Sequence, residues 1–454
     1  MPKILINEKD LTSPGASGDY SNYAVLLVGF AKEDATLATL KESVEKRAKT
    51  KNDVHVDDNN VFEFSSQSAF LEIIGKRSPK LSDNSTTEHY GNQMAYELLG
   101  LGYTVLYRPV FSIAEFAGST DVDAAEFWEV FKDKANYDFR FISHGLLCSS
   151  DEVTTGDINR ANCYIADLAA YHNDNGVERL GRGDCIALVE IDEGFYTDLS
   201  SGKKPEILIA EATEKIGLDI YNGKYCAITV PSVVYDMADD EEFDSNTKFP
   251  GAFHYLACFA NMLGSGFREW YAAAGYTRGV SKYKIDHTSV KLGEIAINAL
   301  EPRCKTGNGT EPAFACNVIA NFRGSYYLWG NRTAFPLHSK DDQKYGDLTA
   351  SCFLNIRHLC ATVKKQLYVA CRRYTFDPNS DTLWFNFVNA IKPTLEAMKA
   401  DQGVRDYRIM KVPTDKKATL KAKIRIIPIE AVEDFDLEVS LEDSFGETTT
   451  VVTE

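Results

Sequence analysis

The sequence predicts a mixed α/β protein built from more than one domain. The chain has 454 residues, which exceeds the size at which a single hydrophobic core stops growing. Between about residues 21 and 284, short apolar runs suited to buried strands alternate with segments of helical periodicity, as in an α/β layer. Long helical patterns dominate after that point, and each end of the chain has a composition of its own.

Charge and composition exclude several classes of function. Apolar residues make up 44% of the chain and charged residues 25%, as in an ordinary folded protein, and the formal net charge is −17. Such an acidic balance argues against binding nucleic acid through its phosphates. The ten cysteines form no C-x-x-C pair and mostly lie in apolar runs, so we expect reduced, buried thiols.

We expect residues 1–20 to form an extended arm. Residues 3–7 (KILIN) are a short apolar run, and residues 12–21 are polar with glycine and proline, as in a linker. The first ten residues lack the apolar core of a signal peptide, and no window approaches the roughly 20 apolar residues of a membrane span. We therefore expect folding in a cytoplasm and no membrane contact.

The region 21–284 is predicted to contain alternating strands and helices. The apolar run at residues 23–30 (YAVLLVGF) predicts a buried strand, and Pro109 is expected to stop a second strand. The predicted strands are 23–30, 103–110, 137–145, 181–192 and 223–235, and the predicted helices are 37–54 (running into a loop), 68–75, 92–102, 160–174 and 251–264.

The region 285–430 has longer helices and is predicted to be a second domain. Helical patterns cover residues 289–302, 351–374 and 380–403, and the last begins near Asp381 and stops at Gly403. Pro393 should bend that helix or mark a boundary. Residues 316–335 predict two strands joined by a glycine turn, and residues 418–429 predict a further strand.

The sign of the charge reverses close to the carboxyl terminus. Residues 405–425 contain eight basic and two acidic residues, whereas residues 426–454 contain nine acids and no lysine or arginine. Residues 435–443 (FDLEVSLED) alternate strictly between apolar and polar, as a strand does. Opposite charges on neighbouring strands stabilise a sheet. This acidic strand either folds back as a hairpin within its own chain or completes a sheet in another subunit.

Several segments, taken in order, resemble the contractile tail sheath proteins of tailed bacteriophages (the myovirus type) and the related sheaths of bacteriocin-like contractile injection systems. The resemblance covers about residues 20–430, with Asp377 where the family's F-E-P-N loop usually has glutamate. The segments that carry it are YAVLLVGFAK, YDFRFISHG, GRGDCIALVEID, KYCAITVPSVVYDM, FPGAFHYLACFANMLGSGFREWYAAAGYTRGV, NVIANFRGSYYLWGNRT and LNIRHLCATVKKQLYVACRRYTFDPNSDTLW.

The resemblance implies a multidomain tail-sheath fold. Residues 21–284 would form the outer and middle region, residues 285–430 an inner assembly domain, and residues 1–20 and 431–454 two terminal arms. It implies that both arms link subunits, and we place their contacts at Ile4, Leu5, Ile6, Phe435, Leu437, Val439 and Leu441. The inner domain would face a tube, and the helix around residues 383–402 is our choice for that contact.

The resemblance also implies a function and a set of partners. The protein would assemble with itself into hexameric rings stacked as a helical sheath, and would contact the tail tube, baseplate and tail terminator proteins. Contraction would drive the tube through the host envelope for genome delivery. It would then be part of a virion, assembled in the host bacterial cytoplasm. The alternative is the sheath of a bacteriocin-like or cellular injection system. Catalysis, cofactors and metals are not expected.

Five residues form a compact motif in the predicted strand pair: Gly324, Trp329, Gly330, Arg332 and Thr333. Glycine permits close backbone approach or a positive φ, Trp329 can bury a large area, and Arg332 can hold carbonyls or a carboxylate. The motif is either an internal packing element or a contact between subunits.

The rival class is a cysteine protease of the caspase-like type. Residues 139–145 form an apolar strand that ends in His144 and Gly145, where that class places its general base, and Cys185 would be the nucleophile. Cys185 begins its strand, however, so we expect it to be buried and inert. The RGD triplet at residues 182–184 leads into the same strand and is expected to be a packed turn.

Overall fold

The computed structural model describes residues 24–31, 35–76, 89–119, 121–146, 154–174, 177–191, 216, 218–219, 221–236, 248–288, 316–335, 349–415 and 418–431. The predicted helix 289–302, the arm 1–20 and the acidic strand 435–443 lie outside these residues. Within the described parts, no helix has the length and apolar character to span a membrane. The same parts contain no cluster of three or more side chains suited to bind a metal ion.

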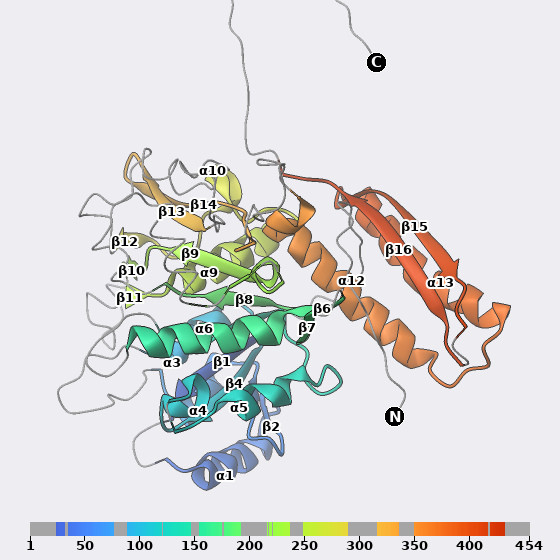
Figure 1. Ribbon diagram of the computed structural model, residues 1–454. Helices are drawn as coiled ribbons and strands as arrows, with labels where there is room; N and C mark the ends of the chain where they lie inside the picture. The colour runs from blue at the N-terminus through green and yellow to red at the C-terminus, as the bar shows by residue number, and fades with distance from the viewer. Residues whose placement is uncertain are drawn as a thin grey trace, which may run out of the picture.

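A nine-stranded sheet forms the body of the protein (Figure 1). Its strands follow the order β14-β13-β9-β8-β5-β1-β4-β3-β2. Neighbours from β13 to β4 are parallel, and β14, β3 and β2 add antiparallel pairs at the two ends. The strands are β1 (Val25–Phe30), β2 (Val54–Val56), β3 (Phe62–Phe64), β4 (Val105–Val110), β5 (Phe141–Ser143), β8 (Ile186–Val189), β9 (Cys226–Val230), β13 (Asn317–Phe322) and β14 (Ser325–Trp329).

Helices cover both faces of this sheet, which explains why its central strands are continuous apolar runs. Along β1, Leu26 and Val28 point into one core while Val25 and Leu27 point into the other. The first core is closed by α4 (Ala114–Ala117), α5 (Ala125–Glu129) with η1 (Val130–Lys132), and α6 (Thr155–Ala169). The second is closed by α1 (Leu37–Ala48), α2 (Gln67–Ile73), α3 (Gly91–Gly100) and α9 (Gly251–Gly264). The predicted mixed α/β fold is confirmed.

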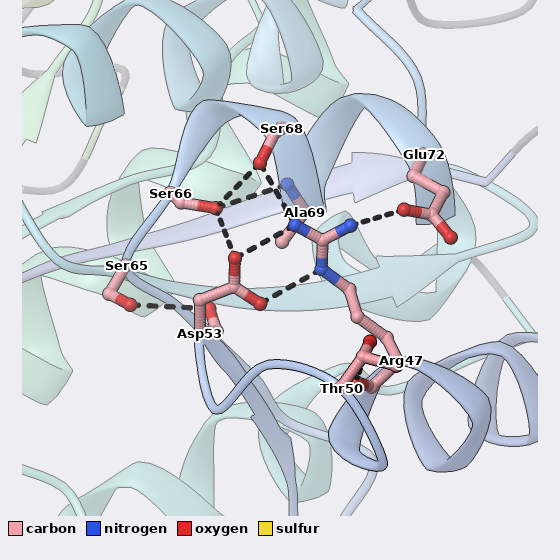
Figure 2. Close-up of polar contacts among 8 residues, drawn as sticks. All are labelled: Arg47, Thr50, Asp53, Ser65, Ser66, Ser68, Ala69 and Glu72. Atoms are coloured by element: carbon pink, nitrogen blue, oxygen red, sulfur yellow. Dashed lines mark hydrogen bonds and ion pairs between the residues drawn. The ribbon is translucent and has the colours of Figure 1, made fainter.

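An ion pair made by a buried arginine fastens the helices at one end of the sheet (Figure 2). Arg47, at the end of α1, donates two hydrogen bonds of 2.8 Å to the carboxylate of Asp53 and also pairs with Glu72 on α2. Ser66 caps α2 and donates to Asp53 at 2.7 Å. The hydrogen bonds from Arg47 hold the pKa of Asp53 well below its usual range. This pair is a local structural clamp.

Two smaller sheets and several short turns complete the body. One sheet has the order β11-β10-β12, from β10 (Val233–Tyr235), β11 (Lys248–Phe249) and β12 (Ile285–Thr288), and the other pairs β6 (Tyr171–Asp174) with β7 (Val177–Leu180). The short helices are η2 (Gly223–Tyr225), α10 (Gly275–Arg278) and η3 (Ala350–Cys352).

A helical unit with its own core projects from the body (Figure 1). It consists of α12 (Leu354–Arg373), α13 (Asp381–Ala400) and the antiparallel pair of β15 (Val404–Val412) and β16 (Lys421–Pro428). The predicted boundary at residue 284 does not interrupt the sheets of the body. Directly after it, β12 pairs with β10, and β13 then pairs with β9. The projecting unit itself begins at α12.

Several segments differ from the sequence prediction. The strands predicted at 137–145 and 181–192 are the shorter β5 and β8, and three other differences have a clear physical reason. The helix predicted at 160–174 is α6, which begins earlier because Thr154 and Asp157 form a capping box, and residues 171–174 are a strand. The strand predicted at 223–235 divides into β9 and β10, because Pro231 has no N–H to continue the ladder. Pro109 lies inside β4 rather than stopping it, since β3 pairs only with residues 105–107 and no ladder bond is lost there.

Candidate assembly surface

The surface that could bind other copies of the chain begins with the β15–β16 sheet. One face of this two-stranded sheet lies on α13, where Tyr407 pairs with Ile426 and Ile409 pairs with Ile424. Among the described residues, no strand pairs with the outer edge of β15 or of β16. Each outer edge therefore presents backbone N–H and C=O groups that another strand can bind.

Helix α13 supports the sheet through a single buried stripe. Phe387, Ile391, Leu395 and Met398 recur at helical spacing and are buried. Ser380 caps the start of the helix, which continues through Pro393, so this proline does not mark a boundary. The predicted helix and its start near Asp381 are confirmed.

Two ion pairs tie α13 to β15. Lys411 on β15 contacts Asp381 at 2.9 Å, and Lys399 on α13 contacts Asp406 at 3.1 Å. Both pairs are exposed, so each contributes little to stability. They orient the two elements relative to one another.

The end of α13 is joined to the body through Trp270. The indole N–H of Trp270 donates to the carbonyl of Asp401 at 3.1 Å, and Arg268 pairs with the Asp401 carboxylate at 3.1 Å. Gly403 lies against the indole, so close that a Cβ there would be 2.9 Å from ring atoms. The N–H of Gly403 also donates to the carbonyl of Met398 at 2.8 Å, which closes the helix. The predicted stop is confirmed, but the residue with positive φ is Gln402, at 60°.

The first half of α12 is embedded in the body. All of its residues from Leu354 to Lys365 are buried. Arg140, at the start of β5, is fully buried and donates to the Thr362 hydroxyl at 2.6 Å and to the His358 carbonyl at 3.2 Å. His358 in turn lies 2.6 Å from the hydroxyl of Tyr255 on α9. Buried polar groups of this kind require specific partners, so they fix the position of the helix.

The RGD triplet is part of the same junction. Arg182 and Asp184 are buried and form an ion pair at 3.0 Å, and Lys364 donates to the carbonyl of Gly183 at 2.8 Å. Burial tends to raise the pKa of Asp184, but Arg182, Lys134 and Lys365 outweigh burial and hold the pKa well below its usual range. The prediction of a packed turn is confirmed.

The residues of the rival protease hypothesis do not form an open site. Cys185 is 1% exposed, and burial raises the pKa of its thiol to about 12. The His144 ring is fully buried, bonds the Asn162 side chain at 2.7 Å, and has a pKa lowered to about 4 by burial. The prediction that Cys185 is buried is confirmed. A thiol that is neutral and covered cannot attack a substrate.

At the position where a doubly wound sheet usually binds a ligand, the described residues pack against one another. The crevice is expected beyond the carboxyl ends of β1 and β5, where the strand order reverses. There the buried ring of His89 lies 2.8 Å from the carbonyl of His144 and packs edge-on against Phe30, with centroids 5.0 Å apart. In the part of the chain that the structure describes, these side chains serve packing.

Comparison with solved structures shows which fold this is. A chain of the anti-feeding prophage (AFP) baseplate matches with a TM-score of 0.60 and 13% identity, covering 97% of this chain and 99% of that one. A chain of the AFP helical sheath in its contracted state has a TM-score of 0.58 and 12% identity, with the same coverage. A chain of the PVC sheath complex, an extracellular contractile injection system in its contracted state, has a TM-score of 0.54 and 13% identity, covering 98% of each.

This chain has the contractile-sheath fold. The match spans nearly the full length of both chains, so the body and the projecting unit are included together. No family model matches the sequence, and no curated protein does. At this level of identity the sheath fold is established by structure alone.

The five-residue motif that supported the resemblance joins α12 to the sheet in this sheath fold. Trp329 packs against Phe322, with centroids 4.8 Å apart, and Arg332 lies over the Phe353 ring at 4.9 Å. Thr333 donates to the Ser351 carbonyl at 2.7 Å. Gly324, at φ 88°, occupies the turn between β13 and β14. A Cβ on Gly330 would lie 2.8 Å from the Asn317 side chain. These are contacts within the chain, and a subunit contact at the motif stays a prediction.

The remaining predicted site residues cannot be placed. The arm contacts at Ile4, Leu5, Ile6, Phe435, Leu437, Val439 and Leu441 lie outside the described residues. Sequence reasoning missed the strand β15, the anchors Trp270 and Arg140, and Asn317, which donates to the carbonyls of Ile228 and Arg332 at 3.0 and 2.9 Å. Of these, β15 had a weak local signal, since its apolar and basic residues are interleaved over 407–412 without strict alternation.

Proposed function

We propose that the chain is the structural subunit of a contractile sheath that polymerises around a tube and contracts to drive it through a cell envelope. The observation that supports this best is the β15–β16 sheet. Both of its outer edges lack a partner strand among the described residues, and the acidic, alternating segment 435–443 follows it in sequence. The sheath fold of the whole chain agrees with this function.

The proposed mechanism is strand donation between copies. Two open edges match two arms: Ile4, Leu5 and Ile6 of one neighbour, and Phe435, Leu437, Val439 and Leu441 of another. Head-to-tail contacts that do not close on themselves build helices, and those that close build rings that can stack. Main-chain hydrogen bonds between donated strands could persist while the bodies rotate. The polar stretch 12–21 and the residues after β16 would act as hinges during contraction.

Two kinds of particle could contain this sheath. The sequence resemblance implies a phage tail, in which hexameric rings contact tube, baseplate and terminator proteins and the virion delivers its genome. The structures named above come from AFP and from an extracellular contractile injection system, and they favour an injection particle. The genes next to this one discriminate, because a phage also encodes capsid and packaging proteins.

Deletion of residues 434–454 tests strand donation. We expect a folded protein that forms no tubes or rings, because the donated strand is gone while the body and projecting unit are intact. A shorter deletion of residues 446–454 is the control, since it keeps the alternating segment and should assemble like wild type. Both are scored by negative-stain electron microscopy. Normal sheaths from the longer deletion would refute donation by this arm.

A further inference from the structure

The face of the β15–β16 sheet that points away from α13 carries stacked cations. Because side chains alternate along a strand, the residues between Tyr407 and Ile409, and between Ile424 and Ile426, point outward. Arg408 therefore lies directly opposite Arg425, and both are exposed. The next outward pairs are Met410 with Lys423 and Val412 with Lys421. We call Arg408, Lys421, Lys423 and Arg425 the cationic face.

This arrangement is unfavourable in an isolated subunit. Like charges directly opposite one another destabilise a strand pair. Among the described residues, none of the four cations has an ion pair. The nearest acid on β15 is Asp406, which Lys399 and, more weakly, Arg408 influence electrostatically. Between the sheet and α13, by contrast, Lys411 of β15 and Lys399 of α13 are each paired. An anionic partner would relieve the repulsion on the outward face.

The acidic segment of the chain fits that requirement. In residues 435–443 the apolar side chains occupy alternate positions, and the positions between them hold Asp436, Glu438, Ser440 and Glu442, three of them acids. A strand added at an outer edge with its apolar side toward the core around α13 would place these acids beside the cationic face. The opposite orientation would press acids onto an apolar core, which is costly. The cations therefore match only one orientation of the strand.

The path of the chain favours a donor from another copy. After β16 ends at Pro428, the N–H of Ile429 still donates to the Gly403 carbonyl at 3.2 Å. Through Ile429 the backbone therefore runs on in the direction of β16, and a segment that continued this way would leave its own sheet. We propose that the cationic face selects residues 433–443 of a second copy and sets the orientation of the donated strand. This inference rests on the proposed strand donation and adds an electrostatic selector to it.

Charge exchange between full-length variants tests the proposal. The face variant is Arg408→Glu with Arg425→Glu, and the arm variant is Asp436→Lys with Glu438→Lys. Each alone should need about tenfold more protein to assemble at low salt, since two or more charge pairs are lost. Mixed one to one, they should assemble near the wild-type concentration, because each acidic arm then meets a basic face and each basic arm an acidic one. Sedimentation and negative-stain microscopy measure assembly.

The possible outcomes distinguish electrostatic selection by the cationic face from strand donation itself. The control Lys46→Glu with Lys49→Glu makes the same charge change at the end of α1 and should assemble like wild type. Circular dichroism checks that every variant is folded. If both charge variants assemble like wild type, the cationic face is not a selector, while strand donation stands. If each variant fails alone and the mixture also fails, the arm does not cross between copies on this face. Normal assembly after deletion of residues 434–454 would overturn strand donation itself.

Discussion

At the scale of single residues, the least expected group is the buried carboxyl of Glu190. It follows β8, and its side chain accepts a hydrogen bond of 3.0 Å from the N–H of Ala252 at the start of α9. Its backbone is held on both sides by Asn162, which accepts its N–H at 3.1 Å and donates to its carbonyl at 2.6 Å. Burial raises the pKa of Glu190 from 4.5 to about 8.

That shift makes a prediction about pH. The pKa of Glu190 is higher in the folded than in the unfolded state, so the folded state binds the extra proton. The contribution of this group to the free energy of unfolding is therefore fully present below about pH 4.5 and is lost as the pH rises to about 8. Glu190→Gln keeps the acceptor but cannot ionise. We expect the difference in free energy of unfolding, variant minus wild type, to increase by on the order of 3 kcal/mol between pH 5 and pH 8.5. Thermal unfolding at the two pH values measures the difference.

The pH range below about 6.5 supplies the control for the Glu190 prediction. Burial lowers the pKa of His89 to about 3 and that of His144 to about 4. The folded protein therefore becomes less stable as the pH falls below about 6.5, where both rings would bind protons in the unfolded state. That loss should be equal in wild type and in Glu190→Gln. A variant that tracks wild type at every pH would show that Glu190 is ionised in the folded protein.

At the scale of elements, the contact between Gly403 and Trp270 joins the projecting unit to the body. We expect Gly403→Ala to destabilise the protein by about 1–3 kcal/mol, because its Cβ would lie 2.9 Å from the rigid indole. Gly264→Ala at the end of α9 is the matched control, since nothing lies within 4 Å of its added Cβ. Chemical denaturation measures both. Equal midpoints for the two variants would mean that the indole can shift freely.

The sequence predicted elements well where the pattern was local. Continuous apolar runs located β1 and α9, and the glycine turn located β13 and β14. Strand β15 was missed because a bulge between Val404 and Asp406 shifts the alternation and half of its residues are polar. The junction of α12 was invisible for another reason. Arg140 and Thr362 are 222 residues apart, and no local pattern predicts that they meet.

At the scale of the whole molecule, α12 couples the sheet-forming end of the chain to the body. Its first half is buried in the body through Arg140, Lys364 and Lys365, and its second half joins the core around α13. Because this helix belongs to both, force applied to the β15–β16 sheet would reach the body through α12. In a sheath, movement of the bodies would then be transmitted to the donated strands.

The proposed tube contact leads to a prediction about the exposed face of α13. The face of α13 opposite its buried stripe is exposed, and Phe385 on it is 64% exposed, so its ring is available to pack against a partner. If that face contacts the tube, Phe385→Ser should weaken sheath formation on purified tubes by about tenfold, since one buried aromatic anchor is lost. Assembly without tubes should be unchanged.

Phe111→Ser is the control, because Phe111 is 48% exposed after β4, on the body. Equal loss of assembly with and without tubes would place Phe385 between sheath subunits, and no loss in either would remove this face of α13 from the assembly.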